Sequence, residues 1–265
     1  MPVFGQGTWH MGERAAARSH EVRALQRGLE LGLTLVDTAE MYAQGGAEEV
    51  VAEAIAGRRD QVFLVSKVYP YNASCSAMVK ACEASLRRLK VETLDLYLLH
   101  WPGSVPLAET VEAFEGLKAA GKINDFGVSN FDTSDLEALV GLDGGLTGSN
   151  QILYNLARRG PEAGVIPHCR QRGIPVMAYS PIDQTRLLRH GGLQDFAAAR
   201  GVSAAQVALA WLLHQPDVVV IPKSARVEGV EENRRALDMP LSPDDLAELD
   251  GLFPPPTGPT PLEIL

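Results

Sequence analysis

The chain has 265 residues, of which 46% are hydrophobic and 22% are charged, close to the average of globular proteins and unlike a disordered chain. Its formal net charge is −9. Such an acidic balance disfavours nucleic acids and anionic membranes as partners, because both attract basic surfaces. No run of about 18 apolar residues occurs, so no transmembrane helix is expected.

The cysteines and the first residues indicate a cytoplasmic protein. There are three cysteines, an odd number, and none are spaced as CxxC. This pattern argues against a disulfide framework and against a cysteine zinc site, and it suits a reducing compartment. The segment Met1–Gly5 lacks the basic and apolar parts of a signal peptide. We therefore expect the protein in the cytoplasm.

Short runs rich in β-forming residues alternate with longer helical patterns along the whole chain. Several of the short runs are almost continuously apolar, which is typical of parallel strands buried on both faces. The first run is the weakest of these signals. The predicted strands are 5–9, 34–36, 62–66, 94–99, 126–128, 149–153, 175–179 and 218–221.

The helical patterns between these strands have apolar residues at helical spacing and recognisable start signals. Ser203 and Gln206 form a capping-box pattern, and Ser242 precedes a proline and two acids. Eight strands alternating with helices, without an internal linker, predict an α/β fold, a single (β/α)8 TIM barrel over 1–265 with a Pro-rich tail from about 253 to 265. The predicted helices are 47–56, 76–89, 107–120, 134–140, 204–214 and one that starts after Ser242.

Most predicted strands are followed by a polar residue that the apolar run does not need. Asp37 follows the second strand, Lys67 the third and His100 the fourth. Each of them alone has a structural explanation, as a helix cap, a solvated strand end or a buried histidine. In a barrel, however, the carboxyl ends of the strands converge on one mouth, where active sites lie. The coincidence therefore favours an active site at this mouth.

These residue types together suit the reduction of a carbonyl group. Asp37 can hold Lys67 as an ammonium, and a cation beside a phenol is expected to lower the pKa of that phenol. Tyr42, five residues after Asp37, is the phenol within reach, although alone it would be interpreted as a surface aromatic. His100 can hydrogen-bond the reacting oxygen. We predict Tyr42 as the proton donor.

Hydride chemistry requires a cofactor, because no side chain donates hydride. The dinucleotide fingerprint is absent, since the glycines of segment 5–10 lack the third member of GxGxxG. A nicotinamide cofactor must then be held by other groups. The candidates are Ser129, Asn130 and Gln151 for the carboxamide, Tyr179 for stacking, and Lys223, Ser224 and Arg226 for phosphate after the last strand.

These residues closely resemble the aldo-keto reductase family. The matching motifs run in the order of the family and span almost the whole chain, which makes the resemblance specific. It implies a (β/α)8 barrel that reduces aldehydes and ketones to alcohols with NADPH, usually without a metal. The motifs lie at 37–42, 65–68, 95–102, 127–131, 150–151, 178–181, 221–224 and 232–233.

The resemblance also implies a role for each matching residue. Asp37, Tyr42, Lys67 and His100 match the catalytic tetrad, with Tyr42 as the general acid. The other matches are Ser129, Asn130 and Gln151 at the nicotinamide amide, Tyr179 as the stacking ring, Ser180 and Ile182 along the pyrophosphate, Lys223 and Ser224 at the 2′-phosphate, Glu232 and Asn233 near the adenine, and Trp9 and Trp101 as walls of the substrate pocket.

Two departures from the family pattern concern cofactor and substrate choice. Many members carry an arginine five residues after the serine of the Lys-Ser motif, where this chain has Gly229. Arg226 can substitute for it, so NADPH is expected while NADH stays possible. The loop that shapes substrate choice in the family is short and Pro-rich here, which predicts an open pocket with broad specificity for small aldehydes.

Two alternative functions stay open. A redox-sensing subunit of a larger complex, similar to the potassium-channel β-subunits of the same family, would keep the barrel and the cofactor but turn over slowly. A metal-dependent hydrolase would need histidine pairs spaced as HxH or HExxH, and the six histidines have neither spacing. We therefore expect no metal, a small carbonyl substrate as partner, and a monomer.

Overall fold

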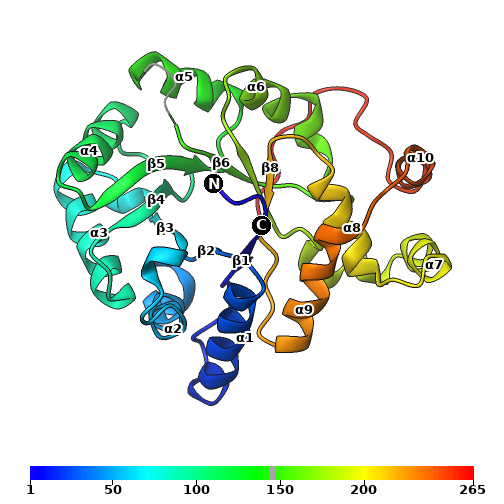
Figure 1. Ribbon diagram of the computed structural model, residues 1–265. Coiled ribbons are helices and arrows are strands. Elements are labelled where there is room, and N and C mark those ends of the chain that lie inside the picture. Colours follow the sequence, from blue (N-terminus) through cyan, green and yellow to red (C-terminus); the bar gives the residue numbers. More distant parts are fainter. Residues whose placement is uncertain (144–146) are drawn as a thin grey trace.

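The structure is a computed structural model, and it describes residues 1–143 and 147–265. Eight parallel strands form one sheet in the order β1 to β8, as predicted (Figure 1). The (β/α)8 barrel is therefore confirmed. The strands are β1 Gly5–Gly7, β2 Leu35–Asp37, β3 Phe63–Val68, β4 Leu94–Leu99, β5 Ile123–Ser129, β6 Asn150–Leu153, β7 Val176–Tyr179 and β8 Val218–Val220.

The sheet closes on itself between its first and last strands. Phe4, just before β1, forms a parallel bridge with Val220 of β8. At the other end of β1, the backbone nitrogen of Gly7 donates to the carbonyl oxygen of Pro222, which follows β8, at 3.0 Å. Closure removes the exposed edges that an open sheet would present to other chains.

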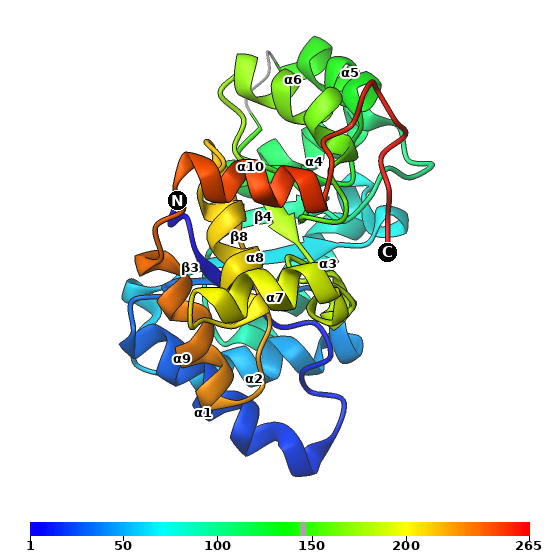
Figure 2. The same cartoon turned by 90° about the vertical axis from the view of Figure 1, so that its right-hand side faces the viewer.

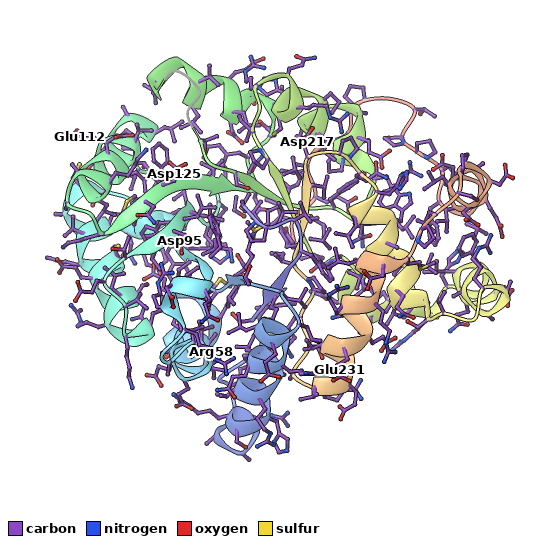
Figure 3. The ribbon with its side chains drawn as sticks, in the orientation of Figure 1. Arg58, Asp95, Glu112, Asp125, Asp217 and Glu231 are labelled. Carbon is purple, nitrogen blue, oxygen red and sulfur yellow. The ribbon has the colours of Figure 1, made fainter. Side chains whose placement is uncertain are left out.

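A ring of helices surrounds the barrel, as Figures 1 and 2 show from two directions. Arg27 of the first helix pairs with Glu231 of α9 at 2.8 Å, and Figure 3 shows Glu231 on this outer ring. The helices are α1 Arg18–Glu30, α2 Gly46–Ala54, α3 Cys75–Leu89, α4 Leu107–Ala119, α5 Thr133–Asp143, α6 Val165–Gln171, α7 Gly191–Ala199, α8 Ala204–Leu213, α9 Val227–Arg235 and α10 Pro243–Leu252.

The core has two parts, because successive strand residues point to opposite faces of the sheet. The larger part lies between the barrel and the helices, where Val36 and Tyr97 are fully buried. The smaller part fills the inside of the barrel, as in other barrels of eight strands. It consists of Leu35, Val65, Leu96, Leu98, Met177, Val219 and Ile221.

The predicted start signals are confirmed at two helices. Ser203 accepts a hydrogen bond from the backbone of Gln206, and Ser242 accepts one from Asp245, so both helices begin with a capping box. The first strand is shorter than predicted, because the chain turns after Gly7. Four helices were not predicted: α1, α6, α7 and α9. Polar residues dominate α1 and α9, which leaves few apolar residues to mark them, and α6 is short and holds a proline in its first turn.

Among the described residues, no single helix is long and apolar enough to cross a membrane. The helices α7 and α8 reach that length only together, as a pair bent by 88°.

The tail after α10 contains neither helix nor strand. In Figure 2 it runs from α10 past α5 and α6 before turning back toward the barrel.

Candidate active site

The polar residues predicted at the strand ends lie on the inward face of the barrel. Leu35, Val65 and Leu98 belong to the group that fills the barrel. Because side chains alternate along a strand, the residue two positions further on points to the same face. Those residues are Asp37, Lys67 and His100.

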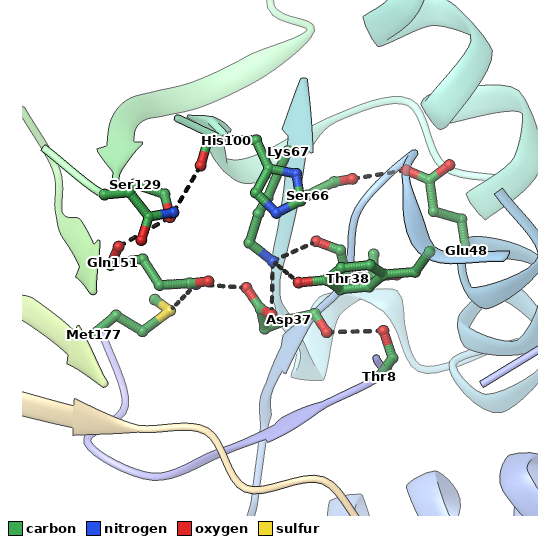
Figure 4. Close-up of polar contacts among 12 residues, drawn as sticks. Thr8, Asp37, Thr38, Glu48, Ser66, Lys67, His100, Ser129, Gln151 and Met177 are labelled. Atoms are coloured by element: carbon green, nitrogen blue, oxygen red, sulfur yellow. Dashed lines mark hydrogen bonds and ion pairs between the residues drawn. The ribbon is translucent and has the colours of Figure 1, made fainter. Parts of the chain in front are cut away.

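Lys67 joins the predicted catalytic residues to one another (Figure 4). Its ammonium Nζ lies 2.8 Å from Asp37 Oδ2 and 3.0 Å from the hydroxyl oxygen of Tyr42. A third bond runs from Nζ to the carbonyl oxygen of Thr38 at 3.0 Å. The rings of Tyr42 and His100 meet edge to face, with their centroids 5.8 Å apart. The four residues are therefore brought together as the sequence predicts.

Lys67 stays charged although it is completely buried. Burial by itself lowers the pKa of a lysine, since it disfavours the ammonium form. Asp37 and Tyr42 act in the opposite direction through their charges and hydrogen bonds, and together they raise the pKa of Lys67 above its ordinary value. Lys67 is therefore an ammonium ion at neutral pH.

The predicted direction of the Tyr42 shift is wrong. Burial raises the pKa of Tyr42, and the nearby charge of Lys67, which lowers it, compensates only in part. Asp37 adds a further increase. The cation alone favours the phenolate, but the cost of placing a phenolate in the barrel mouth is larger. Tyr42 consequently keeps its proton at neutral pH, as a general acid must.

His100 is a neutral imidazole. Burial, with a smaller contribution from the charge of Lys67, lowers the pKa of His100 to about 2. Its Nδ1 is buried and has no hydrogen-bond partner among the described residues. A buried N–H without an acceptor is rarer than a buried acceptor without a donor, so we assign the proton to Nε2. His100 lines the pocket at this mouth, where Nε2–H can donate to a ligand.

The loop that carries Tyr42 has unusual backbone geometry. Three successive residues after it, Ala43, Gln44 and Gly45, have positive φ angles of 51°, 54° and 91°. This region suits glycine, whereas the other residue types adopt it at a cost of about 1–3 kcal/mol each. The surrounding structure must therefore hold the loop in place.

A pocket of about 490 Å³ opens at the carboxyl ends of the strands and collects most predicted site residues. Lys67 lies behind its wall. Ser224, Arg226, Glu232 and Asn233 lie outside the lining. The predicted residues that line the pocket are Trp9, Asp37, Tyr42, His100, Trp101, Ser129, Asn130, Gln151, Tyr179, Ser180, Ile182 and Lys223.

Three amide and hydroxyl side chains meet beside the tetrad, where a nicotinamide carboxamide could bind. Gln151 Nε2 donates to Asp37 Oδ1 at 2.8 Å, and Ser129 Oγ donates to the backbone oxygen of Gln151 at 2.9 Å. Asn130 Oδ1 accepts from the hydroxyl of Tyr179 at 2.9 Å. The side-chain oxygens of Gln151 and Asn130 retain lone pairs for the N–H groups of a carboxamide, whereas the hydroxyl hydrogen of Ser129 is engaged with Gln151 and leaves its oxygen as a further acceptor. These residues therefore fit a nicotinamide ring.

The phosphate candidates follow β8. Lys223 lines the pocket, and burial lowers its pKa. The side chain of Ser224 donates to the backbone oxygen of Arg226 at 3.0 Å and accepts from its nitrogen at 3.2 Å. A Cβ at Gly229 would lie 2.4 Å from this Ser224 oxygen. The turn before α9 therefore fills the space that an arginine at position 229 would need.

Some residues of the pocket were not predicted from the sequence. Thr8 directly follows β1, and its hydroxyl donates to the backbone oxygen of Asp37 at 3.0 Å; the rule of polar strand ends would have found it. Ile264 and Leu265 line the pocket from the tail, and the nitrogen of Leu265 lies 3.4 Å from the hydroxyl oxygen of Tyr179. The pocket is therefore more enclosed on this side than predicted.

Comparison with known proteins agrees with this fold. The profile of the Aldo/keto reductase family matches residues 3–253. The chain therefore belongs to the aldo/keto reductase family. It is 52% identical to methylglyoxal reductase YeaE of Escherichia coli (strain K12), covering 100% of this chain and 95% of that protein. It is 34% identical to a glyoxal reductase of Bacillus subtilis (strain 168), covering 100% and 94%.

Solved structures are similar over the same length. An aldo/keto reductase from Klebsiella pneumoniae in complex with NADP and acetate superposes with a TM-score of 0.98 at 52% identity, covering 100% of this chain and 96% of that one. A second structure from the same organism, in complex with NADPH, has a TM-score of 0.98 at 53% identity, covering 100% and 95%.

Proposed function

We propose that this chain reduces small neutral aldehydes and α-dicarbonyls, such as methylglyoxal, to alcohols with NADPH, and that Tyr42 is the proton donor. The observation that carries the proposal is the position of Lys67 Nζ, 2.8 Å from Asp37 Oδ2 and 3.0 Å from the Tyr42 hydroxyl. Family membership supports it, as do the similar methylglyoxal and glyoxal reductases and the relatives bound to NADP and NADPH.

The side chains at the pocket perform the protein's part of this reaction. Bound NADPH supplies the hydride. Tyr42 and His100 hold the carbonyl oxygen of the substrate through an O–H and an N–H, and Tyr42 gives its proton to that oxygen as negative charge develops on it. The ammonium of Lys67 stabilises the phenolate left behind. Asp37 keeps Lys67 charged in its buried position.

We assign the remaining predicted residues to the cofactor. Ser129, Asn130 and Gln151 would hold the carboxamide, and the ring of Tyr179 would stack on the nicotinamide. The other assigned positions are Ser180 and Ile182 along the pyrophosphate, Lys223, Ser224 and Arg226 at the 2′-phosphate, and Glu232 and Asn233 near the adenine.

The pocket lining supports a small, uncharged substrate. Trp9, Met41 and Trp101 contribute apolar surface near the tetrad, and Ile264 adds more from the tail. Among the described lining residues, Lys223 is the one with a formal positive charge, and we assign it to the cofactor. We therefore expect neutral carbonyls to be reduced more efficiently than carboxylated ones.

NADPH oxidation with methylglyoxal tests the proposal. Tyr42→Phe should reduce kcat by about 10²–10⁴-fold, the usual contribution of a general acid, and leave the Kd of NADPH unchanged. Tyr71→Phe is a matched control, because Tyr71 lies in a nearby loop and is 66% exposed. Full turnover by Tyr42→Phe would reject the role of Tyr42, and a wild-type protein that reduces no carbonyl would reject the proposed function.

We also propose that the chain acts in the cytosol as a monomer. Cys82 and Cys169 are free and buried, and burial raises the pKa of their thiols to about 12 and about 11. Such thiols are unreactive and suit a reducing compartment. Fractionation of the producing cells tests the compartment. Size-exclusion chromatography tests the monomer, which requires a mass near 28.5 kDa.

A further inference from the structure

The strained loop after Tyr42 leads directly into a buried charged residue that the reaction does not use. The loop ends at Gly45, and α2 begins at Gly46 with Glu48 in its first turn. The side chain of Glu48 is completely buried. A buried carboxylate requires partners, because isolated burial of its charge is strongly unfavourable.

Glu48 has two partners, and they belong to two different elements. Its Oε1 accepts a hydrogen bond from Ser66 Oγ of β3 at 2.7 Å (Figure 4), and its Oε2 pairs with Arg88 Nε of α3 at 2.6 Å. Arg88 also donates to Ser85 Oγ at 3.2 Å. The carboxylate therefore ties α2 both to the barrel and to the neighbouring helix.

Ser66 is the residue before Lys67, on the opposite face of the same strand. Lys67 points into the barrel and donates to the Tyr42 hydroxyl, whereas Ser66 points out of it and donates to Glu48. These bonds close a ring of contacts, called the circuit below. The backbone of the loop connects Tyr42 to Glu48, a hydrogen bond connects Glu48 to Ser66, one peptide bond connects Ser66 to Lys67, and a hydrogen bond connects Lys67 back to Tyr42.

Arg88 also supports the loop sterically. A Cβ at Gly45 would lie 2.4 Å from both Cδ and Nε of Arg88, so this side chain passes directly against the backbone of Gly45. Gly45 is the last of the three left-handed residues of the loop. Its positive φ and its contact with Arg88 both require glycine. The pair of Arg88 and Glu48 thus fixes the end of the loop from outside.

From this circuit we infer that Glu48 is a positioning residue for the proton donor. Together with Ser66 and Arg88, it sets the position of the Tyr42 hydroxyl relative to Lys67 Nζ from the outer side of the barrel. The inference deepens the proposed function and rests on it, since it presumes that Tyr42 donates the proton. If Glu48 only packed α2 against α3, variants that break its contacts would melt at lower temperature but would keep the kcat of the wild type.

Ser66→Ala is the first test, because it removes the link to β3 and leaves the pair of Glu48 and Arg88 in place. We expect kcat with methylglyoxal to fall about tenfold, as small misplacements of a catalytic group commonly do. The Kd of NADPH should stay unchanged. Ser149→Ala is the matched control, since Ser149 is also fully buried and donates to a backbone oxygen, that of Pro175.

Arg88→Met is the second test, with Arg59→Met as its control. Arg59 is a close match, because it also pairs with a carboxylate, that of Asp95 at 2.8 Å, and Asp95 in turn accepts a hydrogen bond from the backbone of β3. The side chains of the two arginines are similarly buried, with 31% of Arg59 and 26% of Arg88 exposed. Both variants should melt at lower temperature, but only Arg88→Met should lose kcat. Glu48→Gln should retain more activity than Glu48→Ala, because its amide oxygen can still accept from Ser66.

A readout that does not depend on turnover completes the test. The near-ultraviolet absorbance of the Tyr42 phenolate is obtained as the difference between each protein and its Tyr42→Phe version, over the pH range in which circular dichroism shows an intact fold. A Tyr42 hydroxyl that lies further from Lys67 should ionise at higher pH in Ser66→Ala than in the wild type. Unchanged ionisation and unchanged kcat in Ser66→Ala would overturn the inference. A wild type without carbonyl reductase activity would instead reject the proposed function, and the titration would still decide the role of Glu48.

Discussion

Gln151 and Asp37, which lie 114 positions apart in the chain, share a buried hydrogen bond of 2.8 Å between the amide nitrogen and carboxylate Oδ1. The other oxygen of Asp37 binds Lys67. Gln151 thus contacts the tetrad and lines the space proposed for the nicotinamide. Loss of this bond should affect both the tetrad and cofactor binding.

Gln151→Glu should destabilise the protein in a pH-dependent way. Two adjacent carboxylates cannot both ionise easily, so the folded state raises the pKa of the pair above about 4, the value for an unfolded chain. The folded state then binds a proton that the unfolded state has lost, and the destabilisation grows as the pH rises from about 5 to 7. Thermal melting at these two pH values measures it. Gln151→Met should show a loss that does not vary with pH, and equal behaviour of the two variants would contradict the prediction.

Lys67→Met should unfold more easily and should lose catalysis. The substitution leaves Asp37 as an unpaired buried carboxylate, at a cost of about 3–5 kcal/mol. The double variant Lys67→Met with Asp37→Asn removes that charge and should recover most of the free energy of unfolding in urea. It should stay inactive, because no cation then stabilises the Tyr42 phenolate. Recovery of kcat in the double variant would show that the ammonium is dispensable.

The rate of reduction should not vary between about pH 5 and pH 8. His100, with a pKa near 2, stays neutral across this range, whereas an ordinary histidine would titrate within it. The pKa values of Tyr42 and Lys67 are both raised, so both groups keep their protons as well. A profile of kcat/KM against pH at saturating NADPH tests this. A decline toward acid with a midpoint near 6.5 would show that His100 titrates normally.

Gly229→Arg, which restores the residue found in many relatives, should not by itself improve NADPH binding. The new Cβ would lie 2.4 Å from Ser224 Oγ, which the backbone of Arg226 holds in place. Adding Ser224→Ala should relieve the overlap, and the new guanidinium should outweigh the lost serine hydroxyl, so that NADPH binds more tightly relative to NADH. Lys223→Ala serves as the reference and should weaken NADPH by about tenfold or more, the value of a hydrogen bond to a charged group. The Kd values follow from fluorescence quenching, and a benefit from Gly229→Arg alone would contradict this account.

The alternation of side chains along strands explains why so much of the site could be predicted. Asp37, Lys67 and His100 each follow an inward apolar residue by two positions, so knowledge of the strands places them together. Tyr42, five residues after Asp37, and Gln151, in the sixth predicted strand, could also be proposed from their positions, and the resemblance to the family implied the same roles. Local sequence therefore determined the barrel and its mouth.

The remainder depends on contacts that a single sequence does not reveal. Nothing near Glu48 indicates that its partners are Ser66 and Arg88, which come from two other elements. Leu265 enters the pocket only because the tail returns across the barrel. The direction in which the pKa of Tyr42 shifts depends on how deeply its hydroxyl is buried, and residue types alone do not give that depth.

The bridge between Phe4 and Val220 has a consequence for biosynthesis. A ribosome releases all four tetrad residues well before β8, since His100 is the last of them. Until Val220 has left the ribosome, β1 lacks the strand that pairs with its outer edge, and the strand made last lacks a partner on its own outer edge. Such half-made sheets expose edges that aggregate readily. A truncated product that ends after β5 should therefore precipitate or require a chaperone, although it carries every residue assigned here to proton transfer.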